Sequence, residues 1–310
     1  MDLLVLNRAE VEELLDLGQL LDALRDGFMA LTAGEVTAPG RNELTMPEEA
    51  FLLGMPGRLR EGLMTVKVVT VFESHDPSHL ATIGLYDQRT GACRAFMDGT
   101  YITAIRTSAA AAVATDLLAR EDARTLAIVG AGVQGEHHLR VFGLVREFDD
   151  IRVSSLYRED AERIAALHPN ARAVDDARTA VAGADVVALA THAAQPVVDP
   201  GWIAPGTHVS SVGYRPPDGE LPRELLRGRL FVETREAFEP TPVGCAELQG
   251  RDPRDATELG EVLLGRAPGR MARDEITVYK AMGHVVEDIA AAELVLEAAQ
   301  RDGAGTTVTL

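Results

Sequence analysis

A six-residue glycine pattern places the tightest constraint on the fold. Residues 130–135, GAGVQG, match GxGxxG, follow the apolar run 126–129 directly and precede a helical pattern. In this context the first glycine allows a tight turn, the second lets the backbone approach a diphosphate, and the third lets helix and strand pack closely. Gly130 and Gly132 are therefore predicted to bind a dinucleotide at a helix N-terminus. The alternative is a glycine-rich turn that binds nothing.

The segment around this turn alternates short apolar runs with helical patterns. Strands are predicted at residues 126–129, 151–156, 185–190, 208–212 and 230–232, and helices at 136–148 and 159–167. Short apolar strands separated by helices indicate a parallel sheet covered on both faces. We therefore predict a Rossmann-type domain over residues 119–283.

The flanking segments have a different pattern. They predict two amphipathic helices between residues 9 and 31, β-rich runs at 51–54, 63–72, 81–87 and 92–97, a helical pattern from Tyr101 with an Ala-rich helix at 106–120, and a final helix within 275–300. The β-rich runs indicate an antiparallel sheet, on which the final helix is expected to pack. The fold prediction is an α/β protein in which a Rossmann-type domain is inserted into a smaller α+β domain, residues 1–118 plus 284–310.

Charge and cysteine content restrict the partners. The chain has 30 Lys plus Arg against 48 Asp plus Glu, a formal net charge of −18, which repels phosphate backbones and anionic membranes. No nucleic-acid or membrane partner is expected, since no apolar run approaches the roughly 20 residues of a membrane helix. The N-terminal segment lacks the features of a secretory signal, and Cys93 and Cys245 are far apart. We expect a cytoplasmic protein with reduced thiols.

Lysine is scarce, and both lysines become candidate functional residues. Lys67 and Lys280 stand against 28 arginines. A GC-rich genome explains much of this bias, but a site that needs an ammonium able to lose its proton cannot use Arg. Lys67 lies in a β-rich apolar run, where a lone charge is costly unless it faces a wet or anionic cavity. The alternative is an edge-strand lysine that prevents aggregation.

Two arginines are further candidates for binding an anionic substrate. Arg106 stands before Thr107 at the predicted start of the Ala-rich helix, where a positive charge is disfavoured by the helix dipole. We therefore expect Arg106 to bind a specific anion. The alternative is a surface arginine. Arg41 is a weaker candidate. No metal site is predicted, because the eight histidines form no HxxxH or HxH pair with supporting ligands, apart from the adjacent His137 and His138. No GxSxG pattern supports hydrolase chemistry.

The end of the second strand distinguishes NAD from NADP. Here no carboxylate is present, and Ser155 with Arg158 nearby suits a 2′-phosphate better than a bare ribose. We therefore predict a preference for NADP. Glu159 and Asp160 follow at once and oppose this assignment, and Arg158 is alternatively a solvated residue at a helix start.

Several stretches together resemble the ornithine cyclodeaminase/μ-crystallin family over essentially the whole chain. They are Met55-Pro56, the strand up to Lys67, residues 85–87 with 90–91, residues 97–110 (MDGTYITAIRTSAA), GAGVQG, and residues 276–292 (ITVYKAMGHVVEDIAAA). The resemblance implies an N-terminal sheet domain, completed by the C-terminal helix, that binds substrate and dimerises, and an inserted Rossmann domain for NAD(P). It also implies an amino or imino acid substrate and a homodimer.

The resemblance further implies roles for individual positions. Arg41 and Lys67 would bind the substrate carboxylate, Arg106 would lie beside the nicotinamide and the substrate, and Met282 would line the substrate pocket. The implied cofactor contacts are Thr82, Thr107, Val133, Gln134, Ser155, Thr191, Val212 and Gly213.

One departure separates this chain from the cyclodeaminases. Those enzymes carry an Asp, which orients the second amino group of ornithine, directly after the strand that here leads to Gly213, where this chain has residues 214–217, YRPP. Arg215 cannot receive an ammonium, and two prolines separate Asp218 from the expected place. Ala281 also replaces a family Ser, which removes one cofactor hydrogen bond. Reduction of a cyclic ketimine, or interconversion of a 2-oxo acid and an amino acid, is therefore the favoured activity.

The predicted reaction is hydride transfer between NAD(P)H and C2 of an imino acid whose carboxylate is held by Lys67 with Arg41 or Arg106. Lys67, or water that it holds, would move the proton on nitrogen if neighbouring Arg charge lowers its pKa. Two alternatives stay open: an ornithine cyclodeaminase that releases ammonia with bound NAD, and an NADP-binding protein without catalytic activity. Substrate size would depend on the loops at 47–50 and 73–79.

Overall fold

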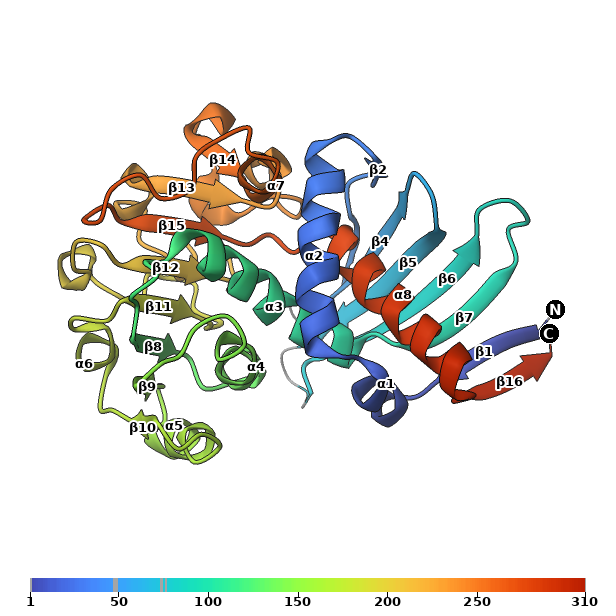
Figure 1. Ribbon diagram of the computed structural model, residues 1–310, viewed down its shortest axis with the longest axis horizontal. Coiled ribbons are helices and arrows are strands. Elements are labelled where there is room, and N and C mark those ends of the chain that lie inside the picture. Colours follow the sequence, from blue (N-terminus) through green and yellow to red (C-terminus); the bar gives the residue numbers. More distant parts are fainter. Residues whose placement is uncertain (1, 47–49, 73–74, 76, 310) are drawn as a thin grey trace. The chain divides into compact units, whose positions relative to one another are not determined.

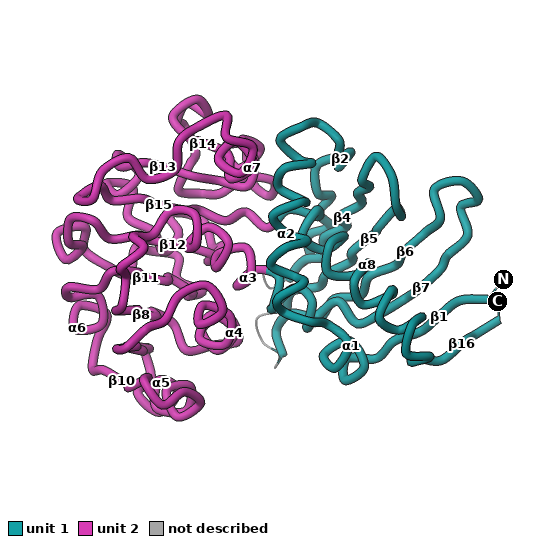
Figure 2. Tube along the Cα trace, in the orientation of Figure 1, with its two compact units in different colours: residues 1–106, 284–310 teal, residues 107–283 magenta. Residues whose placement is uncertain are grey.

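The computed structural model describes residues 2–46, 50–72, 75 and 77–309, which fold as two compact units (Figure 2). Unit 1 comprises residues 1–106 and 284–310, and unit 2 comprises residues 107–283. The first division falls inside helix α3 (Thr100–Leu118), at whose end we had placed the predicted boundary. Residues 47–49, 73, 74 and 76, in the two loops expected to set substrate size, lie outside the described residues.

Unit 1 is a mixed sheet with helices packed on it (Figure 1). The strand order is β16-β1-β7-β6-β5-β4-β2, with β3 paired to β4, and all pairs are antiparallel except β1 with β7. Helix α8 packs on β4, β5 and β6, and α2 packs on α8. The elements are β1 (Asp2–Leu6), α1 (Arg8–Leu14), α2 (Leu17–Thr32), β2 (Val36–Thr37), β3 (Asn42–Thr45), β4 (Phe51–Leu59), β5 (Leu63–Val71), β6 (His79–Asp87), β7 (Cys93–Asp98), α8 (Val285–Asp302) and β16 (Thr306–Thr309).

The predicted helices and β-rich runs of unit 1 are confirmed, with three corrections. The four β-rich runs pair antiparallel as predicted, but the complete sheet is mixed, because β1, which was not among those runs, is parallel to β7. Neither β1 nor β16 was predicted, since their pairing joins the two ends of the chain and leaves no local signal. The final helix begins only at Val285, and residues 277–280 are strand β15 of the other sheet. All four residues of β15 are buried, so the strand shows no alternation to distinguish it from a helix.

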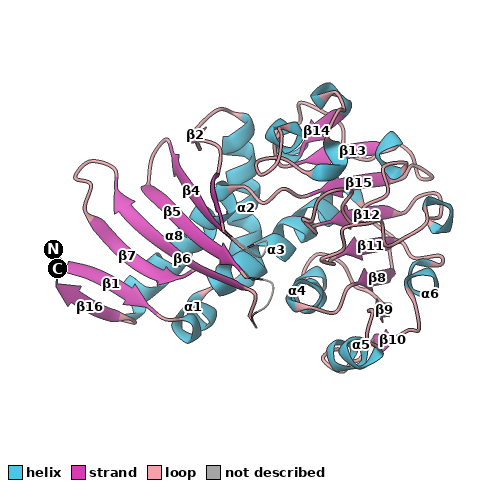
Figure 3. Cartoon of the chain, turned by 180° about the vertical axis from the view of Figure 1, so that it is seen from behind, coloured by secondary structure: helices cyan, strands magenta, loops and turns pink. Residues whose placement is uncertain are grey.

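Unit 2 is an all-parallel sheet in the order β10-β9-β8-β11-β12-β15-β13-β14, which confirms the predicted Rossmann-type fold class (Figure 3). Its first five strands have the 3-2-1-4-5 order of dinucleotide-binding folds, which reverses between β8 and β11. The elements are β8 (Thr125–Val129), α4 (Val133–Phe142), β9 (Asp150–Ser154), α5 (Arg158–Ala165), β10 (Ala171–Ala173), α6 (Ala177–Val181), β11 (Val186–Leu189), β12 (His208–Ser211), β13 (Arg229–Val232), β14 (Ala256–Glu258), α7 (Leu259–Leu263), β15 (Thr277–Lys280) and short 3₁₀ helices at 200–202, 225–227, 235–238, 246–248 and 253–255.

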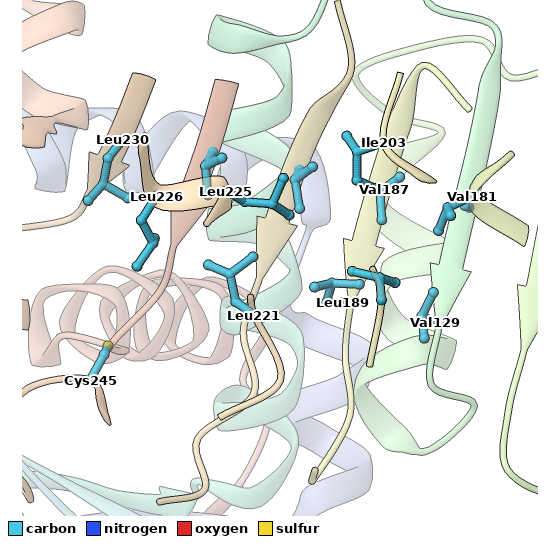
Figure 4. Close-up of a cluster of buried hydrophobic side chains, with 14 of the residues drawn as sticks. Val129, Val181, Val187, Leu189, Ile203, Leu221, Leu225, Leu226, Leu230 and Cys245 are labelled. Atoms are coloured by element: carbon cyan, nitrogen blue, oxygen red, sulfur yellow. The ribbon is translucent and has the colours of Figure 1, made fainter. Parts of the chain in front are cut away.

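The core of unit 2 is aliphatic. Val187 and Leu189 of β11 pack in one buried cluster with Leu225, Leu226 and Leu230 (Figure 4). Burial of such side chains contributes about 1.5–3 kcal/mol each. This core supports the strands whose carboxyl ends carry the predicted cofactor residues. Within the described residues, no helix is both long and apolar enough to cross a membrane.

Candidate functional site

Lys67 is buried in the middle of β5 and paired with a carboxylate from the far end of the chain. Its side chain is 1% exposed, and its Nζ lies 2.9 Å from Oδ1 and 2.8 Å from Oδ2 of Asp288, which is fully buried in the first turn of α8. Removing one partner from a buried ion pair costs about 3–5 kcal/mol. Because β5 pairs with both β4 and β6, the edge-strand alternative is wrong.

Arg106 reaches the same carboxylates from helix α3. Its Nη1 lies 2.6 Å from Oε2 of Glu287, and its Nε lies 3.2 Å from Oδ1 of Asp288. The expected anion is therefore present, and the surface alternative is wrong because Arg106 is buried. Its predicted place at the helix start is also wrong, since α3 begins at Thr100. The anionic partners of Arg106 thus come from α8. The dipole of α3 does not require them, because Arg106 does not lie at the start of that helix.

The two acids belong to a capping arrangement at the start of α8. His284 is the N-cap, and its Nδ1 accepts the N–H of Val286 at 3.1 Å. Glu287 accepts the N–H of His284 with one oxygen at 2.9 Å and binds Arg106 with the other. Negative charge in a first helical turn is favoured by the helix dipole, which offsets part of the cost of burying these carboxylates.

Burial and neighbouring cations give Lys67 an unusual pKa. Loss of hydration is the largest cause, the charge of Arg106 is the next, and Asp288 opposes both; together with a smaller effect of Arg41 they lower the pKa of Lys67 from 10.5 to about 8. Arg41, in the loop before β3, also contributes to lowering the pKa of His284 to about 4, an effect that burial dominates. His284 is therefore neutral at pH 7.

The cluster gathers three basic side chains around two acidic ones. Lys67 pairs with Asp288, Arg106 pairs with Glu287 and Asp288, and the charge of Arg41 is close enough to help lower the pKa of Lys67. Basic side chains grouped in this way suit the binding of a substrate carboxylate. The structure therefore brings the three predicted cations together and adds two carboxylates that the sequence analysis did not assign.

On unit 2, the glycine turn fits a dinucleotide. Gly130 has φ +111°, and a Cβ on it would lie 2.3 Å from the carbonyl oxygen of Ala190; a Cβ on Gly135 would lie 2.0 Å from that of Gly130. A Cβ on Gly132, by contrast, would meet nothing within 4 Å. Gly132 is the N-cap of α4, and no side chain caps this helix start through a hydrogen bond. Such a helix start suits a diphosphate.

The other predicted cofactor positions of unit 2 follow neighbouring strands at the same edge of the sheet. Ser155 follows β9, Thr191 follows β11, and Val212 and Gly213 follow β12. The order of these strands brings the four positions around the point where the strand order reverses, the place where such folds bind ligands. In addition, Val133 and Gln134 open α4, and the side chain of Val133 is 59% exposed although apolar.

Three predicted residues lie elsewhere. Thr82 is exposed in β6, on the face opposite Lys67, because its neighbour Ile83 is the ladder partner of Lys67. Thr107 continues α3 into unit 2. Met282 is half-buried after β15, and its N–H donates to Glu233 at 2.9 Å.

Arg158 opens α5 and is bonded to carboxylates. Its Nε donates to Oε1 of Glu162 at 2.8 Å, and its Nη1 is paired with Asp175. A 2′-phosphate would therefore have to compete with two acids for this guanidinium. After Gly213 the chain has a cis bond between Pro216 and Pro217, and Asp218 is exposed. The side chain from this segment that contacts Gly213 is Glu220, which sequence reasoning missed because it lies in irregular structure.

Comparison with known proteins adds to this geometry. The model of the ornithine cyclodeaminase/mu-crystallin family matches residues 1–303. Ketimine reductase mu-crystallin of Mus musculus is 37% identical over 286 residues, 89% of this chain and 90% of that protein. Delta(1)-pyrroline-2-carboxylate reductase of Thermococcus litoralis, in complex with NADH and L-proline, has a TM-score of 0.92 at 33% identity, covering 98% of this chain and 100% of that one. An archaeal alanine dehydrogenase dimer with bound NAD has a TM-score of 0.89 at 26% identity over 100% of both chains.

Proposed function

The chain belongs to the ornithine cyclodeaminase/mu-crystallin family, and we propose that it uses a nicotinamide coenzyme to reduce the C=N bond of a 2-imino acid. It is an NAD(P)-dependent oxidoreductase that acts on C–N bonds, as an imine or ketimine reductase or an amino acid dehydrogenase. The observation that carries the proposal is the buried cluster of basic side chains around Lys67, in a chain similar to a ketimine reductase and to a reductase that binds NADH and L-proline.

The cationic cluster provides the substrate half of the reaction. Lys67, with Arg41 or Arg106, holds the carboxylate and thereby fixes the position of C2. Lys67 donates a proton to the imine nitrogen, a role supported by its pKa of about 8, which leaves the ammonium able to release a proton near neutral pH. A bound nicotinamide supplies the hydride that C2 receives. The product nitrogen is then an amine, and Lys67 regains a proton from solvent.

Unit 2 provides the coenzyme half. Gly130, Gly132, Val133 and Gln134 form the diphosphate turn, and the positions after β9, β11 and β12 border the rest of the coenzyme. The proposed preference for NADP rests on Ser155 and on the absence of a carboxylate at the end of β9. It requires Arg158 to exchange Asp175 for a 2′-phosphate, whereas the two solved relatives described above hold NADH and NAD.

The sheet of unit 1 provides a surface for the proposed homodimer. Leu80 is 54% exposed and Phe96 is 42% exposed, and both lie on the sheet face opposite Lys67. The register shows this for Phe96, because Phe96 pairs with Gly84 and Gly84 pairs with Val66, the neighbour of Lys67. Exposed apolar side chains grouped on one sheet face are typical of an interface. Because the archaeal alanine dehydrogenase is a dimer, we propose that a second copy of the chain covers this face.

The test is a panel of cyclic ketimines, and of 2-oxo acids with amines, each assayed with NADH and NADPH. The proposal expects substrate-dependent loss of coenzyme absorbance with one coenzyme oxidised per amine formed. Ammonia release from ornithine without net NADH would instead support a cyclodeaminase. Coenzyme binding without turnover on any member of the panel would support a binding protein.

A further inference from the structure

Lys280, the second lysine of the chain, has no part in the proposed reaction. It ends β15 and is fully buried; its Nζ donates to the carbonyl oxygen of Gly213 at 2.6 Å and to Oγ of Ser211 at 3.1 Å, and lies 2.9 Å from Oε1 of Glu247. Loss of hydration disfavours the ammonium, but the carboxylates of Glu247 and Glu220 outweigh it, and the pKa of Lys280 is raised. Lys280 is therefore a fixed cation, whereas the proton of Lys67 is exchangeable.

Glu220 holds the same loop with its two oxygens. Oε1 accepts the N–H of Gly213 at 2.7 Å and the hydroxyl of Ser211 at 2.9 Å. Oε2 accepts the N–H of Thr191 at 2.6 Å and the hydroxyl of the same residue at 2.7 Å. Glu220 is fully buried. Gly213 is thus held through its N–H by Glu220 and through its carbonyl by Lys280.

These contacts join two loops at one edge of the parallel sheet. Thr191 follows β11 and Gly213 follows β12, and a Cβ on Gly213 would lie 2.5 Å from the carbonyl oxygen of Thr191. In such folds the end of the second strand, here β9, binds the ribose of the adenosine half. The nicotinamide half then extends across the switch point toward β11 and β12.

We propose that Glu220 and Lys280 are positioning residues that fix the Thr191 and Gly213 loops for the nicotinamide half of the coenzyme. The inference rests on the proposed function, because it presupposes that unit 2 binds the dinucleotide. Only a carboxylate fits position 220, since each of its oxygens faces a backbone N–H. An amide would turn its NH₂ toward one of them and leave that loop without an acceptor.

The test compares NADH with ADP, which lacks both the nicotinamide and its ribose, by calorimetry on the full chain carrying Glu220→Gln. NADH affinity should fall about tenfold, equivalent to about 1.4 kcal/mol. ADP affinity should stay within about twofold, because its expected contacts lie on the β8 and β9 side of the switch point. Equal weakening of both ligands, or of neither, would overturn the inference.

Asp185 offers a matched control at the opposite edge of the same sheet. Its Oδ2 accepts the N–H of Arg124, the residue before β8, at 2.8 Å. The same oxygen accepts the N–H of Thr125, the first residue of β8, at 2.9 Å. Asp185→Asn should lower the melting temperature, as Glu220→Gln should, but leave both affinities unchanged. A selective loss of NADH binding in this control would mean that general destabilisation explains the effect and that the inference is wrong.

A milder variant keeps the inference testable if Glu220→Gln does not fold. Ser211→Ala removes the hydroxyl that links Lys280 to Glu220 and keeps both charges. It should weaken NADH selectively, by about threefold, since a net hydrogen bond is worth about 0.5–1.5 kcal/mol. Unchanged selectivity would contradict the inference. Failure of the wild-type chain to bind either ligand would overturn the proposed function itself.

Discussion

The reductive reaction should lose rate as pH rises through about 8, the pKa of Lys67. The fall from 10.5 to about 8 corresponds to a penalty of about 3 kcal/mol on the buried ammonium. With that pKa the ammonium fraction is about 0.9 at pH 7 and about 0.1 at pH 9, so kcat/KM for imine reduction should drop about tenfold between them. Oxidation of the amine needs the free amine of Lys67 as base, so its kcat/KM should rise by the same factor.

The assay is the initial rate of coenzyme absorbance change across this pH range, for wild type and Lys67→Arg. The guanidinium of the variant keeps the charge but does not titrate in this range. The change near pH 8 should therefore disappear in the variant, while turnover falls in both directions. Any effect of pH on the substrate itself is the same for the wild type and the variant, so the difference between their pH profiles reports on Lys67. Full turnover of Lys67→Arg, or persistence of the change near pH 8, would refute an acid-base role for Lys67.

Three further outcomes follow from the described contacts. Asp288→Asn should lower the free energy of unfolding by about 3–5 kcal/mol in chemical denaturation, because it breaks a buried ion pair. The same variant should move the kinetic pKa of Lys67 below 8, because Asp288 raises that pKa. An upward shift of the kinetic pKa would contradict the assignment of the ion pair. Asp175→Asn, by releasing Arg158, should tighten NADPH relative to NADH in calorimetry, and an unchanged ratio would remove Arg158 from coenzyme selection. Phe96→Asp should convert a dimer into monomers in sedimentation, and a dimer that persists in this variant would contradict the proposed interface.

The glycine turn between β8 and α4 could be predicted from the sequence because all its determinants are local. The strand, the glycines and the helix start lie within a few residues, and at Gly130 and Gly135 the structure shows why a side chain does not fit. The scarcity of lysine also drew attention to Lys67 and Lys280 as candidate functional residues. Both are buried in the structure, and their functional roles stay predictions.

The partners of these cations could not be predicted, because they are distant in the chain. Lys67 and Asp288 are 221 residues apart, and only the packing of α8 on β5 brings them together. The error at Arg106 has a local cause. The Ala-rich stretch begins at that residue, but it is the interior of a helix that begins at Thr100, where the N–H of Tyr101 donates to Oδ1 of Asp98.

Calorimetric titration of the full chain with NADH and with NADPH tests the central claim most directly, since every proposed role depends on coenzyme binding by unit 2. The account expects saturable binding of at least one coenzyme, with one dinucleotide per chain. Absence of binding by both coenzymes at millimolar concentration would contradict it.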